Sequence, residues 1–179
     1  MLYADDRIAV LIDGVNLHAA ARALDFEIDY KSLRDHFQKA GKLVRLAYYT
    51  TVIDSKEQAP IRPLIDWLDY NGFAVKSKIA REFTDETGGR KIKGTMAIEL
   101  ALDAMNLAGH VDHIILFTGD GEYRYLVEKL QERSIRVSIC STHKTKPSMA
   151  SDELRRQADS FIELSDLKAF IGRTSQSRP

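Results

Sequence analysis

The chain has 179 residues, 44% of them apolar, and its 26 basic side chains are balanced by 26 acidic ones. This length and apolar content exclude a chain that is disordered throughout and suit one compact domain. The longest apolar runs hold four to five residues, whereas a membrane-spanning helix needs about 20. With no net charge, contact with nucleic acid requires a local basic patch.

The chain's amino-terminal segment and its cysteine content both indicate a reducing cytoplasm. The first residues, Met-Leu-Tyr-Ala-Asp-Asp-Arg, do not form the basic segment followed by an apolar stretch that directs export. The single cysteine, Cys140, cannot form an internal disulfide. We therefore expect a cytoplasmic protein.

Apolar, β-branched runs alternate along the chain with segments of helical periodicity. In chain order we predict strands at Ile8–Asp13, Leu43–Val52, Ala74–Ile79, His113–Thr118, Ile135–Cys140 and Ser160–Leu164. Between and after them we predict helices at Leu17–Leu24, Tyr30–Ala40, Pro60–Asn71, Thr95–Ala108, Glu122–Arg133, Ala150–Gln157 and Leu167–Phe170. This alternation favours βαβ units and a mostly parallel sheet covered on both faces.

One segment interrupts the alternation. Residues Ile79–Lys93 form two short alternating runs around Asp-Glu-Thr-Gly-Gly, which indicates a hairpin or flap beside the third strand. No linker divides the chain, so we expect a single domain over residues 1–171. The polar segment 172–179 is predicted to be a disordered tail.

Two predicted strands end in an acid followed by glycine. The first ends in Asp13-Gly14-Val15-Asn16 and the fourth in Thr118-Gly119-Asp120-Gly121-Glu122. Ligand sites of open α/β sheets lie at the carboxyl ends of the strands, and converging carboxylates favour Mg²⁺ or Mn²⁺. Such a metal suits chemistry at a phosphodiester. Alternatively, Asp13 and Asp120 only cap the helices that follow them.

Three segments carry a family resemblance: VLIDGVNLH (10–18), KIKGTMAIELALDAM (91–105) and FTGDGEYRYLVEKL (117–130). Together, in this order, they resemble the signature blocks of NYN domains of the LabA-like group, in the PIN-like nuclease superfamily. The resemblance implies a PIN-like, Rossmannoid three-layer α/β/α fold with a sheet of five to six strands in the order 3-2-1-4-5. It also implies metal-dependent ribonuclease activity.

The same resemblance implies the site residues. Asp13, Asp103 and Asp120 match family acids and are the expected Mg²⁺ or Mn²⁺ ligands. Glu122 stands where a second acid follows in the third block, and Asn16 matches the asparagine of the Asp-Gly-x-Asn turn.

The second block departs from the family at Ala97, where relatives read Lys-Gly-x-x-Asp. Glu99 cannot replace that acid, because at about 100° per residue it points about 200° away from position 97. Asp103 lies about 9 Å further along the helix and about 120° round. We interpret Ala97 as a deliberate Asp→Ala change that inactivates the protein, with natural loss of activity as the second interpretation. Glu99, Asp103 and Asn106 form one stripe, which faces either the site or water.

Basic residues surround the predicted hairpin and lead into the second block. The expected RNA contacts are Lys78, Arg81, Arg90, Lys91 and Lys93, although a basic hairpin is also an ordinary solvated sheet edge. Tyr123 and Tyr125 are candidates for stacking on bases, but a packing role is the more common one for such side chains.

The sequence therefore predicts a metal-dependent endoribonuclease that binds RNA, acts as a homodimer and is impaired by Ala97. The alternative from a different class is a non-catalytic member of the same fold that binds RNA or a protein. A phosphatase is less well supported, because the segment Asp13-Gly14-Val15 lacks the second acid of an Asp-x-Asp nucleophile motif.

Overall fold

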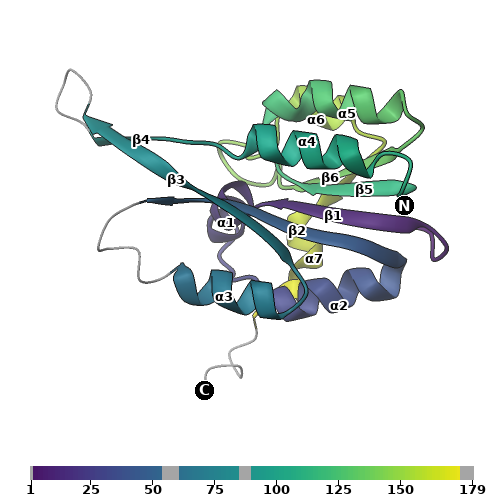
Figure 1. Cartoon of the computed structure of the whole chain (residues 1–179), viewed down its shortest axis with the longest axis horizontal. Helices are drawn as coiled ribbons and strands as arrows, with labels where there is room; N and C mark the ends of the chain where they lie inside the picture. Colours follow the sequence, from purple (N-terminus) through teal and green to yellow (C-terminus); the bar gives the residue numbers. More distant parts are fainter. Residues whose placement is uncertain (1, 54–60, 85–89, 174–179) are drawn as a thin grey trace.

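A seven-stranded sheet forms the centre of the protein (Figure 1). The computed structural model describes residues 2–53, 61–84 and 90–173. The strands are β1 (Arg7–Asp13), β2 (Lys42–Ile53), β3 (Ala74–Thr84), β4 (Arg90–Lys93), β5 (His113–Phe117), β6 (Arg136–Ser141) and β7 (Ser160–Glu163). Their spatial order is β4-β3-β2-β1-β5-β6-β7, and every neighbouring pair is parallel except β3 and β4. The six parallel strands are those predicted, in the expected order 3-2-1-4-5 with the sixth added beyond the fifth.

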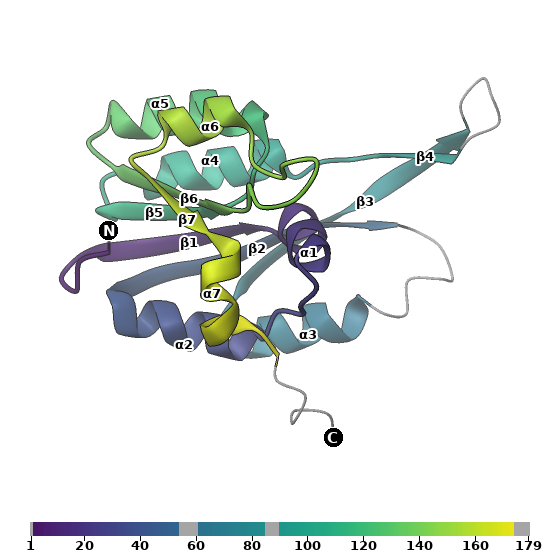
Figure 2. The same cartoon turned by 180° about the vertical axis from the view of Figure 1, so that it is seen from behind.

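Helices cover both faces of this sheet and complete three layers (Figures 1 and 2). The helices are α1 (Gly14–Ala23), α2 (Tyr30–Ala40), α3 (Arg62–Tyr70), α4 (Ala97–Leu107), α5 (Arg124–Gln131), α6 (Asp152–Gln157) and α7 (Leu164–Ile171), with a 3₁₀ turn η2 (Gly121–Tyr123) before α5. Helices α4, α5 and α6 lie on one face, and α1, α2, α3 and α7 lie on the other. The predicted three-layer α/β/α fold is confirmed.

The central strand β1 supplies both cores. Ala9 and Leu11 pack in the cluster under α4 and α5, whereas Ile8, Val10 and Ile12 pack under α1, α2 and α7. Side chains of a strand alternate between faces, and a strand covered on both sides is apolar throughout. This explains why the run Ile8–Ile12 is continuously apolar and fully buried.

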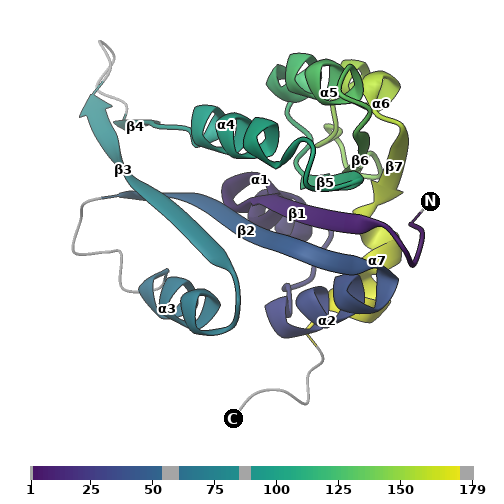
Figure 3. The ribbon, with the colours of Figure 1, turned by 45° about the vertical axis from the view of Figure 1, so that its right-hand side comes forward.

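The predicted hairpin is formed by β3 and β4. Strand β3 continues past its predicted end at Ile79 as far as Thr84, and β4 pairs with this extension in antiparallel register. Figure 3 shows the two strands projecting from the body of the molecule. The Asp-Glu-Thr-Gly-Gly turn and residues 174–179 lie outside the described residues. The side chains of Arg81, Arg90, Lys91 and Lys93 do too, although their backbones belong to β3 and β4.

None of the helices in residues 2–53, 61–84 and 90–173 is both long and apolar enough to cross a bilayer.

A buried histidine in β5 makes the stability of the fold sensitive to acid. The His113 side chain is fully buried, its Nε2 atom lies 2.7 Å from Ser138 Oγ, and its Nδ1 atom has no hydrogen-bond partner among the described residues. Burial, reinforced by the positive charge of Arg136, lowers the pKa of His113 from 6.5 to about 4. The unfolded chain therefore binds a proton that the folded chain does not, and stability falls as the pH drops from 6.5 towards 4.

We expect this histidine to remove about 3 kcal/mol from the free energy of unfolding over that pH range. The measurement is urea unfolding of the protein and of a His113→Gln variant from pH 7.5 to pH 4. The variant should lose less stability on acidification than the unchanged chain. Equal losses in both proteins would show that His113 is not responsible.

Candidate functional site

The side chain of Asp13 lies at the carboxyl end of β1 and starts helix α1. Its Oδ1 atom accepts a hydrogen bond from the backbone N–H of Asn16 at 3.1 Å. Because this cap forms, α1 begins at Gly14, earlier than the predicted Leu17. A side chain at position 14 would overlap the ring of Tyr48, so glycine is required for the turn.

Asp120 occupies the equivalent place after β5, the strand that pairs with β1 on the side away from β2. Its Oδ1 atom accepts a hydrogen bond from the backbone N–H of Glu122 at 3.0 Å and caps η2. Its own N–H donates to Thr118 Oγ1 at 3.2 Å. Both acids thus cap the segments that follow them, as one interpretation of the sequence expected. In doing so they keep their carboxylates at the same edge of the sheet.

Two hydrogen bonds join the acid-bearing turns, and both are donated from the segment after β5 to the turn after β1. The backbone N–H of Gly119 donates to Asn16 Oδ1 at 2.9 Å, and the Tyr123 hydroxyl donates to Asp13 Oδ2 at 3.4 Å. The side chain of Asn16, the last residue of the Asp-Gly-x-Asn turn, therefore links the two turns. The sequence could not identify the contact of Tyr123, because it joins positions 110 residues apart.

The electrostatics of Asp13 show that negative charge is crowded at this edge. Burial is the main cause that raises the pKa of Asp13, and the charge of Asp120 raises it further. The hydrogen bonds from Asn16 and Tyr123 act in the opposite direction. Neighbouring carboxylates repel each other, and a divalent cation bound between them relieves that repulsion. These hard oxygen donors fit Mg²⁺ or Mn²⁺ in kind.

Asp103 has hydrogen-bond partners other than Asp13 and Asp120. Its Oδ2 atom accepts a hydrogen bond from the Tyr49 hydroxyl at 2.6 Å, and Lys76 Nζ lies 2.7 Å from the carboxylate. One helical turn earlier, Glu99 forms an ion pair with Lys78 at 2.9 Å. The polar stripe of α4 therefore faces the lysines of β3, and not the acid pair or open water as we expected. The structure gives Asp103 a role in joining α4 to the sheet.

Ala97 is the first residue of α4 and packs against the buried cluster that contains Leu100 and Tyr123. Helix α4 runs back across the sheet from the edge at which β1 and β5 end, so position 97 lies at that edge. Within residues 2–53, 61–84 and 90–173, no three histidine, cysteine, aspartate or glutamate side chains form a group suited to a metal.

The other predicted site residues are more scattered. Glu122 is exposed, and its backbone N–H donates to the capping carboxylate of Asp120. Lys78 is held by Glu99 and is partly exposed. The backbone of Lys93 is paired with that of Arg81 at the base of the β3–β4 hairpin. Tyr123 is buried and Tyr125 is exposed, so Tyr125 alone of the two presents its ring to solvent.

Comparisons with known proteins agree with this architecture. The NYN domain family model matches residues 7–165. The chain is 30% identical over 183 aligned residues to the low amplitude and bright protein LabA of Synechococcus elongatus, an alignment that covers 100% of this chain and 95% of LabA. A solved structure of a protein of unknown function from Vibrio parahaemolyticus superimposes with a TM-score of 0.69 at 24% identity, covering 93% of this chain and 96% of that one, and shows the same fold. With its three sequence blocks gathered around one edge of a three-layer sheet, this chain belongs to the NYN domain family, which is PIN-like and whose members are usually nucleases.

Proposed function

We propose that this protein has the framework of a metal-dependent endoribonuclease whose acidic site is incomplete at position 97. The observation that carries the proposal is the pair of hydrogen bonds that the turn of Asp120 donates to the turn of Asp13, next to a helix that begins at Ala97. Hydrogen bonds from both turns orient the two carboxylates before any ligand binds. Restoring an acid at position 97 adds the third carboxylate at the same edge.

The proposed ion is Mg²⁺ or Mn²⁺, held by Asp13, Asp120 and the family acid at position 97. Such an ion activates water and stabilises the charge that develops on a phosphodiester. The protein's own part is to hold the two carboxylates in place. Asn16 and Gly119 keep the two turns together, and a bound cation would offset the cost of keeping the buried carboxylate of Asp13 ionised.

The proposed substrate is RNA, approached along the β3–β4 hairpin that carries Arg81, Arg90, Lys91 and Lys93. Lysine and arginine neutralise phosphates, and each such contact makes binding more sensitive to salt. Lys78, which was also expected to contact RNA, would first have to leave Glu99. The proposal further includes a cytoplasmic location and a homodimer.

The test is RNA cleavage by the unchanged chain and by an Ala97→Asp variant, each with Mg²⁺, with Mn²⁺ and with EDTA. We expect the variant to cleave single-stranded RNA only with metal, and at least about a hundredfold faster than the unchanged chain. Equal rates, or cleavage that persists in EDTA, would contradict the proposal.

One observation favours a second function for the chain as it stands. Because the described residues contain no three-ligand group, a non-catalytic RNA- or protein-binding role is compatible with the same surface. This role predicts that the Ala97→Asp variant cleaves no RNA and that neither metal raises its melting temperature.

A further inference from the structure

We propose that Tyr123 is a positioning residue for Asp13, and that its buried hydroxyl fixes the carboxylate in the orientation used to bind the metal. This inference rests on the proposed function. In this proposal Tyr123 does not bind the metal itself and acts only through its hydrogen bond to Asp13.

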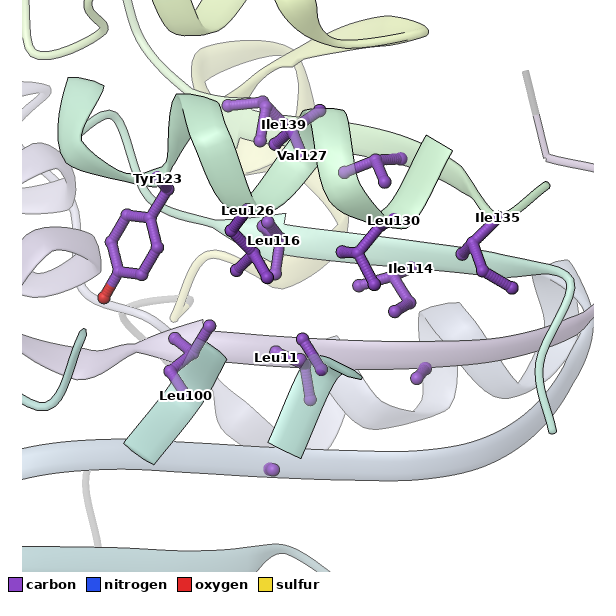
Figure 4. Packing of buried hydrophobic residues seen from close by; sticks show 14 of the residues in the cluster. Leu11, Leu100, Ile114, Leu116, Tyr123, Leu126, Val127, Leu130, Ile135 and Ile139 are labelled. Carbon is purple, nitrogen blue, oxygen red and sulfur yellow. The ribbon is translucent and has the colours of Figure 1, made fainter. Parts of the chain in front are cut away.

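The ring of Tyr123 is held firmly by the core. It is 3% exposed and packs in the cluster of β1, β5, α4 and α5. Figure 4 shows its hydroxyl pointing out of that cluster, away from the leucines beside it. The hydroxyl reaches Asp13 Oδ2 at 3.4 Å, at the long end of the hydrogen-bond range, so its main contribution is a fixed direction and not a strong bond.

The place of Tyr123 in the chain couples the two acids. It lies three positions after Asp120, in the same 3₁₀ turn that Asp120 caps. A displacement of that turn therefore moves the donor for Asp13 and the carboxylate of Asp120 together. A second hydrogen bond from the same side, donated by the N–H of Gly119, is accepted by Asn16 in the turn of Asp13. Oδ1 of Asp13 accepts from the Asn16 N–H and Oδ2 accepts from the Tyr123 hydroxyl, so rotation of the carboxylate breaks both bonds.

A second buried tyrosine provides the matched control. Tyr49 is 1% exposed, belongs to the same cluster as Tyr123, and also donates its hydroxyl to an aspartate. Its partner is Asp103, whose carboxylate also contacts Lys76 and not Tyr123. Removing either hydroxyl costs a buried hydrogen bond, but only one of the two bonds ends on Asp13.

The experiment measures Mn²⁺ binding by calorimetry to three proteins: Ala97→Asp, Ala97→Asp with Tyr123→Phe, and Ala97→Asp with Tyr49→Phe. Phenylalanine keeps the ring and its packing, and thermal unfolding of each variant checks this. We expect Tyr123→Phe to weaken Mn²⁺ binding about tenfold or more, as other substitutions beside metal ligands do, and Tyr49→Phe to leave it unchanged. In RNA cleavage at saturating Mn²⁺, Tyr123→Phe should lower kcat and leave KM for RNA unchanged.

Three outcomes would overturn the inference in distinguishable ways. Equal Mn²⁺ affinities in all three proteins would overturn it and leave the proposed function intact. Equal losses in both tyrosine variants would show that a buried hydroxyl matters only for structure. Absence of Mn²⁺ binding by Ala97→Asp itself would overturn the proposed function, and the inference with it.

Discussion

In an Ala97→Asp background, Asp13→Asn is expected to reduce metal-dependent RNA cleavage at least about a hundredfold. Asparagine keeps the size of the side chain and a carbonyl oxygen that can still cap α1 through the N–H of Asn16. It removes the negative charge that a divalent ion requires. The loss should therefore appear in activity and in Mn²⁺ affinity, while the melting temperature without metal stays the same or rises, because a crowded charge has been removed.

The matched control for Asp13 is Asp103→Asn in the same background. Asp103 is an acid of the same type, but its carboxylate is held by Tyr49 and Lys76. We expect this variant to lose some stability, since Lys76 loses its ion-pair partner, and to keep its metal-dependent cleavage. A loss as large as that of Asp13→Asn would show that Asp103 binds the metal, as the family motif suggested, and that its observed contacts rearrange when metal is present.

Gly119→Ala is expected to destabilise the protein by about 3 kcal/mol or more. A Cβ atom at this position would overlap the carbonyl oxygen of Met149 and lie 2.6 Å from Ser141 Oγ. The backbone there cannot move freely, because the Gly119 carbonyl accepts a hydrogen bond from Ser151 N–H and its N–H donates to Asn16. The displaced loop carries Asp120, so Mn²⁺ binding in the Ala97→Asp background should be lost as well.

Gly121→Ala serves as the comparison for this glycine. Its added Cβ would meet Ser151 Oγ at 2.9 Å, the end of a side chain that can rotate away. Urea unfolding of both variants at pH 7.5 should show a much smaller loss for Gly121→Ala. If Gly119→Ala and Gly121→Ala lower the free energy of unfolding equally, the effect comes from replacing a glycine in this loop and not from the contact with Met149.

Much of the fold could be predicted from the sequence because its strands are covered on both faces. Burial on both sides makes a strand continuously apolar, as in Ile8–Ile12, and such runs mark strand positions clearly. The two acids could be located for a related reason, since each follows a buried strand and precedes a glycine. The extension of β3 to Thr84 was missed, because it depends on pairing with β4 and not on burial in the body of the sheet.

The contacts of the acids could not be predicted, because they join positions far apart in the chain. Asp103 contacts Tyr49, 54 positions away, and Lys76, 27 positions away. Helical geometry placed Asp103 and Glu99 on one stripe, but it could not show that Lys76 and Lys78 of β3 lie opposite that stripe. The burial of Tyr123 and the exposure of Tyr125 likewise follow from how the turn η2 leads into α5.

The most direct test of the account is to locate Mn²⁺ by its anomalous scattering in crystals of the Ala97→Asp variant. The account predicts one ion bound between Asp13, Asp120 and the carboxylate introduced at position 97, with Asp103 still bonded to Tyr49. An ion bound at Asp103, or crystals soaked in Mn²⁺ that show no ion near the ends of β1 and β5, would contradict it.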